Sequence, residues 1–191
     1  MDPARGITFR PLTPARWGDL VSLFGPRGAC AGCWCMWWRL PRGTYNRNKG
    51  SRNRAALRRL TVKGPPPGIL AYDGSRAVGW CALAPRSSYP GLGRSRILAP
   101  VDDLPVWSVT CFFIARDWRR KGLSAALLEA AAAWAKRRGA RILEGYPTAP
   151  GGDAPDVFVW TGLAASYEAA GFREVTRRSP TRPIMRRSLV G

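Results

Sequence analysis

The strongest constraint on the fold of this chain is a strand-like run, a short basic turn and a helix-like run that follow one another between residues 106 and 138. Residues 106–114 are mostly apolar and rich in β-branched and aromatic side chains, which favours a central strand covered on both faces. Residues 122–138 are rich in alanine and predict a helix. One helical stripe of that run carries Leu123, Leu127, Ala131 and Trp134. This order of elements is typical of a mixed α/β domain.

The rest of the chain also alternates between strand-like and helix-like patterns. Further strands are predicted at residues 7–10, 69–72, 77–83, 141–146, 172–176 and 184–189. Further helices are predicted at residues 13–24, 53–60 and 162–170, while residues 28–47 and 85–105 are expected to form loops. No run approaches the roughly 18 apolar residues that span a bilayer, and the first residues do not resemble a signal peptide. We therefore expect a single cytoplasmic α/β domain over residues 1–191, with no membrane partner.

The charge of the chain is strongly positive and unevenly distributed. The formal net charge is +19, from 31 Lys and Arg against 12 Asp and Glu. No acidic residue lies between Asp19 and Asp73, and a second basic cluster covers residues 173–187. Such a field attracts phosphate-rich partners and repels cationic ones. Two interpretations stay open: a polyanionic macromolecular partner, or a solvated basic face combined with an anionic cofactor.

The residues that are missing or few limit the chemistry. The chain contains no histidine, which excludes Ser-His-Asp catalysis, an imidazole base and a histidine zinc helix. Cys30, Cys33 and Cys35 cluster, but a structural zinc site needs four ligands and the sequence offers no second pair at zinc-binding spacing. We expect free thiols and no metal, with a reactive or regulatory thiol as the alternative.

A turn between the strongest strand and the strongest helix has the chemistry of an anion site. Residues 116–121 hold four cations, and Gly122 allows a ligand to approach the backbone closely. The first amides of a helix lack intrahelical acceptors and bind anions such as a pyrophosphate. The dinucleotide and NTP glycine patterns are absent. A solvated helix start is the alternative.

Several motifs together resemble the GNAT-type N-acetyltransferases. The run R-R-K-G-L-S at 119–124 resembles the family pattern [Q/R]-x-x-G-x-[G/A], with Ser124 in place of the usual Gly or Ala. The run Y-E-A-A-G-F at 167–172 resembles the family's later Y-x-x-x-G-F. The segments C-W-C-M-W-W-R at 33–39 and P-V-D-D-L-P-V-W-S-V at 100–109 resemble an actinobacterial subgroup. The resemblance covers nearly the full length.

The resemblance implies a fold and a donor site. It implies a central mixed, mostly antiparallel sheet that is splayed between its fourth and fifth strands and flanked by about four helices. The donor is acetyl-CoA, with its pantetheine in the splayed gap. Carried over to this chain, backbone groups would pair with the pantetheine at Phe112, Phe113 and Ile114, and the amide of Ile114 would polarise the thioester carbonyl. The pyrophosphate would be held by Arg119, Arg120, Lys121, Gly122, Leu123 and Ser124.

The resemblance also suggests catalytic residues. Tyr167 would protonate the leaving thiolate, and the alternative is a core aromatic residue. Glu144 is the first candidate for the base that keeps the attacking amine neutral, and the alternative is an exposed carboxylate paired with arginine. Loop carboxylates that could reach the acceptor are Asp102, Asp103, Asp153 and Asp156. A water chain without a side-chain base also stays open.

Three functions are compatible with these features. The first is an acetyl-CoA-dependent N-acyltransferase that transfers an acetyl group to a small primary amine by direct attack, as a monomer or homodimer. The second is a tRNA-associated enzyme of the same fold, which acetylates aminoacyl-tRNA or uses it as the acyl donor. The third is a nucleic-acid-binding protein without activity, which the intact Gly122 and Tyr167 disfavour. An aromatic loop interleaved with arginines, around Trp34, Trp37 and Trp38, suits either packing or stacking on bases.

Overall fold

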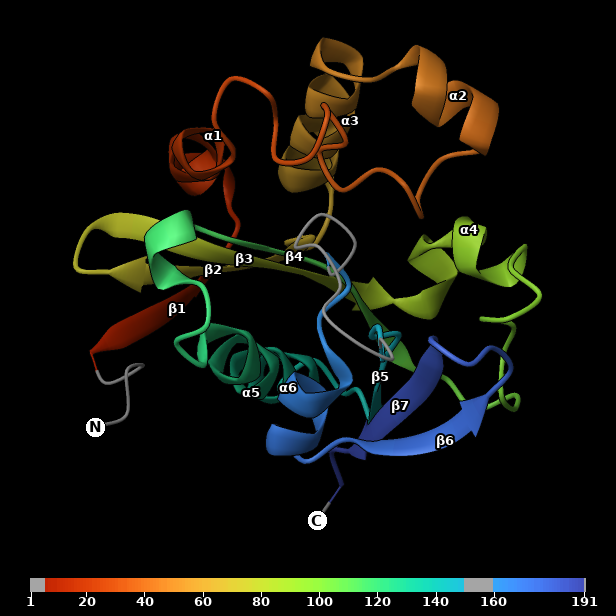
Figure 1. Ribbon diagram of the computed structural model, residues 1–191. Coiled ribbons are helices and arrows are strands. Elements are labelled where there is room, and N and C mark those ends of the chain that lie inside the picture. Colours follow the sequence, from red (N-terminus) through yellow and green to blue (C-terminus); the bar gives the residue numbers. More distant parts are fainter. Residues whose placement is uncertain (1–5, 150–159, 191) are drawn as a thin grey trace.

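A computed structural model of the chain describes residues 6–149 and 160–190. Its seven strands form one sheet in the order β1-β2-β3-β4-β5-β7-β6 (Figure 1). The strands are β1 (Ile7–Pro11), β2 (Gly68–Asp73), β3 (Arg76–Pro85), β4 (Trp107–Ile114), β5 (Ile142–Gly145), β6 (Arg173–Arg177) and β7 (Pro183–Ser188). All neighbours are antiparallel except β4 and β5, which are parallel. The predicted mixed, mostly antiparallel sheet is confirmed, with the strongest predicted strand at its centre.

Helices cover both faces of the sheet (Figure 1). The helices α5 (Leu123–Lys136) and α6 (Ala164–Ala169) lie on one face, and the opposite face carries α1 (Trp17–Phe24), α2 (Arg42–Arg47), α3 (Ser51–Lys63) and α4 (Pro90–Gly93). Short 3-10 turns form at η1 (Pro14–Arg16), η2 (Arg86–Ser88) and η3 (Arg116–Trp118). Leu123, Leu127 and Ala131 of the predicted stripe are buried, because this stripe of α5 packs on β2, β3 and β4.

Two helices lie in segments that we expected to be loops. Arg42–Arg47 forms α2 and Pro90–Gly93 forms α4, so the described residues hold six α-helices instead of about four. Each of the two buries a single side chain, Tyr45 or Leu92, and neither has an apolar stripe that a sequence pattern can reveal. The basic helix α3 is also longer than the predicted 53–60. No helix in the described ranges combines the length and the apolar character needed to cross a membrane.

The sheet opens between β4 and β5, as predicted. The two strands pair only from Trp107 to Val109, opposite Leu143 to Gly145. Beyond this point they diverge (Figure 1), and residues 160–163 bridge the two sides. The amide of Phe112 on β4 donates to Trp160 O at 2.7 Å, and the amide of Thr148 after β5 donates to Gly162 O at 2.8 Å. We call the region between the diverging ends of β4 and β5, which residues 160–163 cross, the gap.

Candidate functional site

The turn between β4 and α5 presents a run of free backbone amides. Arg120 and Gly122 both have left-handed backbones, with φ of 57° and 75°. The amides of residues 120–124 donate no hydrogen bond to any described residue, whereas those of Ala125 and Ala126 donate to Gly122 O. Alternating backbone conformations at a helix N-terminus create a concave group of N–H donors that binds anions. We call residues 120–124 the amide cradle.

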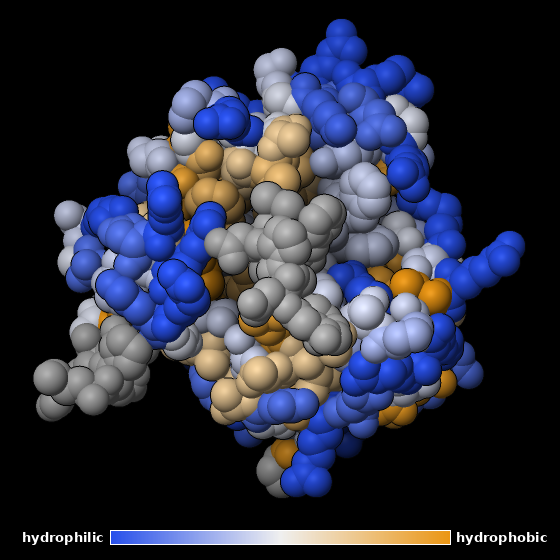
Figure 2. Space-filling view, in the orientation of Figure 1, coloured by the Kyte–Doolittle hydropathy of each residue, from blue (hydrophilic) through white to orange (hydrophobic). Residues whose placement is uncertain are grey.

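The surroundings of the cradle are positively charged. Arg116, Arg119, Arg120 and Lys121 are all exposed. The acidic neighbour, Asp117, receives two hydrogen bonds from Arg76 at 2.8 and 3.1 Å, and these lower its pKa. Figure 2 shows hydrophilic side chains gathered over the segment between β4 and α5. Because Arg76 neutralises Asp117, this carboxylate does not cancel the positive charge of the turn, which favours an anionic ligand.

Arg120 is strained by its backbone conformation, which gives a first prediction. A left-handed backbone costs a side-chain-bearing residue about 1–2 kcal/mol, and glycine avoids most of this cost. We expect Arg120→Gly to be about 1 kcal/mol more stable than Arg120→Ala in denaturant unfolding. Both variants lose the same charge, so both should bind a polyanionic ligand equally weakly. Equal unfolding free energies would show that the strain is relieved elsewhere in the turn.

The exposed edge of β4 offers the second part of the site. The amide of Phe112 faces the gap, since it donates to Trp160 O, and Ile114 O accepts from Arg119 Nε at 3.3 Å on the same side. Backbone groups of successive strand residues point to opposite edges. Phe113 therefore directs its backbone toward β3, as does Ala115, whose amide donates to Val78 O. Of the predicted pantetheine partners, Phe112 and Ile114 face the gap and Phe113 does not.

Tyr167 contacts Phe112 of β4 on one side of this gap and lies against Gly145 of β5 on the other. It is fully buried on α6, packs edge-on against Phe112, and donates from its hydroxyl to Thr161 O at 3.1 Å. A Cβ atom on Gly145 of β5 would lie 2.0 Å from the Tyr167 ring, so only glycine fits beside it. Burial raises the pKa of Tyr167 well above its usual range, which keeps the phenol protonated. The position combines a core aromatic ring with a hydroxyl that can donate a proton.

Glu144 is held on the opposite side of the sheet from α5. Its side chain is fully buried; Oε1 accepts from Arg86 at 2.8 Å and Tyr146 at 2.6 Å, and Oε2 accepts from Arg186 at 2.7 Å. Arg186 also pairs with Asp102, which ties that loop carboxylate to the same network. To take a proton from an amine, Glu144 would have to give up one of these bonds.

The other predicted residues have varied surroundings. The Leu123 side chain is buried in the core, so Leu123 can offer only its amide to a ligand. The Ser124 hydroxyl lies 3.0 Å from the Ser166 hydroxyl and links the cradle to α6, next to Tyr167. Asp103 is exposed, and Asp153 and Asp156 lie outside the described residues.

The cysteines and the aromatic loop belong to the layer above the sheet. Cys35 Sγ donates to Cys111 Sγ at 3.4 Å in a cluster on the α1–α3 face, so Cys111 points away from α5. Trp34 and Tyr45 are buried, and Arg54 and Lys49 lie over their rings, so neither can stack on a base. Within residues 6–149 and 160–190, no His, Cys, Asp and Glu gather in a group able to hold a metal.

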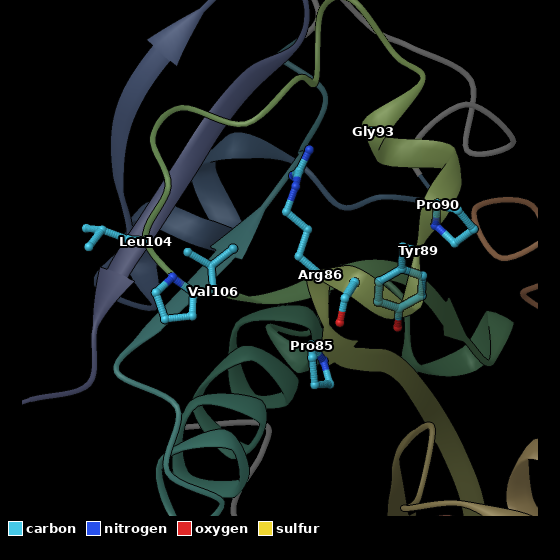
Figure 3. A pocket seen from close by; sticks show the side chains of 9 residues that line it. Pro85, Arg86, Tyr89, Pro90, Gly93, Leu104 and Val106 are labelled. Carbon is cyan, nitrogen blue, oxygen red and sulfur yellow. The ribbon is translucent and has the colours of Figure 1, made fainter.

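A cavity of about 370 Å³ lies apart from the cradle. Its lining comes from the end of β3, from α4 and from the segment that leads into β4 (Figure 3). Figure 3 shows Arg86 between Val106 and Tyr89, and its guanidinium belongs to the Glu144 network described above. Because β4 runs from this cavity to the cradle, the two sites lie toward opposite ends of the strand.

Comparisons with known proteins agree with this geometry. The model of the acetyltransferase (GNAT) family matches residues 34–150. No curated protein matches the sequence. Among solved structures, a GNAT-family putative acetyltransferase from Desulfovibrio desulfuricans is similar, with a TM-score of 0.56, 15% identity, and coverage of 96% of this chain and 99% of that one.

Two further structures with this fold were solved with a CoA compound. The paia N-acetyltransferase of Thermoplasma acidophilum, in complex with coenzyme A, has a TM-score of 0.53 and 15% identity over 95% of this chain and 98% of that one. A GNAT superfamily phosphinothricin acetyltransferase of Sinorhizobium meliloti, in complex with AcCoA, has a TM-score of 0.54 and 18% identity over 96% and 88% of the two chains. At these identities the likeness establishes the fold, and the predicted fold is confirmed.

Proposed function

The chain belongs to the acetyltransferase (GNAT) family, and we propose that it transfers an acetyl group from acetyl-CoA to a primary amine by direct attack. The observation that carries the proposal is the amide cradle at the end of β4: amides of residues 120–124 that donate to no described residue, next to the edge of β4 that no longer pairs with β5. The CoA compounds in two structures of the same fold support this donor. The finer likeness to an actinobacterial subgroup stays a prediction.

The proposal gives each part of the donor site a role. The amides of residues 120–124 hold the pyrophosphate, and Arg119, Arg120 and Lys121 add positive charge. Phe112 and Ile114 pair with the pantetheine through their backbones. The amide of Ile114 polarises the thioester carbonyl. The amide of Phe112 is bonded to Trp160 O at 2.7 Å, so Phe112 pairs with the pantetheine only when it gives up that bond. Acetyl-CoA supplies the activated acyl group, and the chain positions it.

The catalytic residues also stay proposals. Tyr167 donates its phenolic proton to the leaving thiolate, which its contact with Phe112 beside the splay supports. Direct proton removal by Glu144 stays a prediction. Its three donors favour an indirect role, in which Glu144 fixes Arg86 and Tyr146 at the start of the splay and solvent accepts the proton from the amine.

The basic face of α3 favours the second candidate, a tRNA-associated enzyme of the same fold. Arg52, Arg58, Arg59 and Lys63 are exposed and form no ion pair with any described residue. RNA bound through such cations would dissociate steeply as salt rises. Turnover of free amines at full rate without RNA would favour the first candidate.

A thermal-shift titration tests the donor site. At 100 times its Kd, acetyl-CoA should add about 2.7 kcal/mol to the free energy of unfolding, a clear rise in Tm. CoA should give a similar rise and ATP none, because the cradle is built for a pyrophosphate that continues into a pantetheine along β4. No rise with either CoA compound would contradict the proposal.

A further inference from the structure

The turn between β6 and β7 places an arginine without a counter-ion beside the splay. Arg182 directly precedes β7, whose first residues lie next to the end of β5 (Figure 1). It is partly buried, and burial lowers its pKa. No carboxylate of the described residues pairs with it. Three other partly buried arginines each pair with Glu or Asp: Arg86, Arg186 and Arg187.

The contacts of Arg182 hold one side of its guanidinium and leave the other free. Nη1 donates to Thr148 Oγ1 at 3.0 Å and to Thr161 Oγ1 at 3.1 Å. Nε and Nη2 donate to no described group, and neither nitrogen is a buried atom that lacks a hydrogen-bond partner. Since Nε and Nη2 form the flat fork that matches a carboxylate, the arginine is oriented by the threonines and open to a bidentate anion.

Arg182 also lies next to the proposed chemistry. Thr161 accepts from Arg182 through its hydroxyl. Its carbonyl oxygen accepts from the Tyr167 hydroxyl at 3.1 Å. The preceding residue, Trp160, accepts the Phe112 amide. The guanidinium, the proposed acid and the β4 amide therefore converge on residues 160–161. An anion on Arg182 would belong to a molecule that is reacting in the gap.

We infer that Arg182 binds a carboxylate of the acceptor, and that the acceptors are amines bearing a carboxylate, such as amino acids. A partly buried guanidinium has lost part of its hydration, and a carboxylate supplies two charge-assisted hydrogen bonds in its place. The net charge of +19 acts in the same direction, since it repels polycationic amines and attracts anionic ones. The inference rests on the proposed function, because it names the acceptor for that site.

The test compares acceptors that differ in the carboxylate, with kcat/KM expressed per neutral amine so that the different amine pKa values do not enter the comparison. Amino acids and their carboxamides are assayed in pairs, with CoA release as the readout. We expect kcat/KM to favour the amino acid by about 100-fold, because a lost charge-assisted bidentate contact costs about 3 kcal/mol. In Arg182→Gln this preference should disappear through a higher KM for the amino acid, with the Kd of acetyl-CoA unchanged. Arg182→Lys should recover part of the preference. Arg173→Gln, an exposed β6 variant that removes the same charge, should keep all of it.

Three outcomes would overturn the inference. The first is equal kcat/KM for the two members of each pair. The second is a preference that survives in Arg182→Gln. The third is a selectivity that follows a carboxylate on the acyl group, seen when succinyl-CoA outcompetes acetyl-CoA. Should the variants lose stability, the wild-type protein still decides the matter through binding: with CoA present, N-acetyl amino acids should raise Tm and their amides should not. Failure of acetyl-CoA to bind would instead reject the proposed function.

Discussion

Gly122→Asp is expected to abolish acetyl-CoA binding, with Kd rising by about 100-fold or more. The substitution has two effects. A side chain at φ 75° strains the backbone, and a carboxylate placed at the cradle repels the pyrophosphate that the amides would bind. The strain lowers the stability of the free protein, and the repulsion is what raises Kd, by about 3 kcal/mol of binding free energy. Isothermal titration of the purified variant with acetyl-CoA measures the change directly.

The other end of the same helix provides a matched control. Gly139 follows α5, has a φ of 82°, and has open space around its Cα. Gly139→Asp adds the same side chain in the same kind of backbone conformation, so it should cost stability without changing the Kd of acetyl-CoA. An unchanged Kd in Gly122→Asp, or an equal loss in both variants, would reject the cradle as the pyrophosphate site.

The parts of the site that the sequence could predict are those formed by local contacts. The cradle needs only a strand, a turn with Gly122 and a helix start, all within about 20 residues of one another. The strained backbone of Arg120 was not predictable, because a left-handed arginine has no sequence signal. The long elements β4 and α5 were recognised for a similar reason, since each carries enough periodic apolar residues to reveal its type.

The parts that escaped prediction depend on contacts between distant segments. Arg182 meets its threonine partners 34 and 21 positions away in the chain, and no spacing rule connects them. Glu144 was a candidate base, or alternatively an exposed carboxylate paired with arginine. The pairing with arginine is right and the exposure is wrong, because Arg86 of η2 and Arg186 of β7, 58 and 42 positions away in the chain, enclose the carboxylate.

Tyr167→Phe is expected to lower kcat by about 100-fold, the usual contribution of a general acid. Without the hydroxyl, the thiolate leaves unprotonated, while the ring still fills the space beside Gly145 and Phe112. The Kd of acetyl-CoA should therefore stay the same. Because burial raises the pKa of Tyr167, wild-type kcat should not fall through ionisation of this group as the pH rises from neutral to moderately basic values. Steady-state kinetics over that range measure both effects.

Tyr72→Phe separates the loss of a buried hydroxyl from the loss of an acid. Tyr72 of β2 is also buried, away from the gap, and its hydroxyl donates to the Asp19 carboxylate of α1 at 2.7 Å. Each variant loses one hydrogen bond, worth about 1 kcal/mol of unfolding free energy for the neutral Thr161 carbonyl and about 1.5–3 kcal/mol for the charged Asp19. Only Tyr167→Phe should lose turnover, since only its hydroxyl lies beside the splay. If both variants convert substrate at the wild-type rate, Tyr167 is a core residue whose hydroxyl only hydrogen-bonds the Thr161 carbonyl. The proton for the thiolate then comes from solvent.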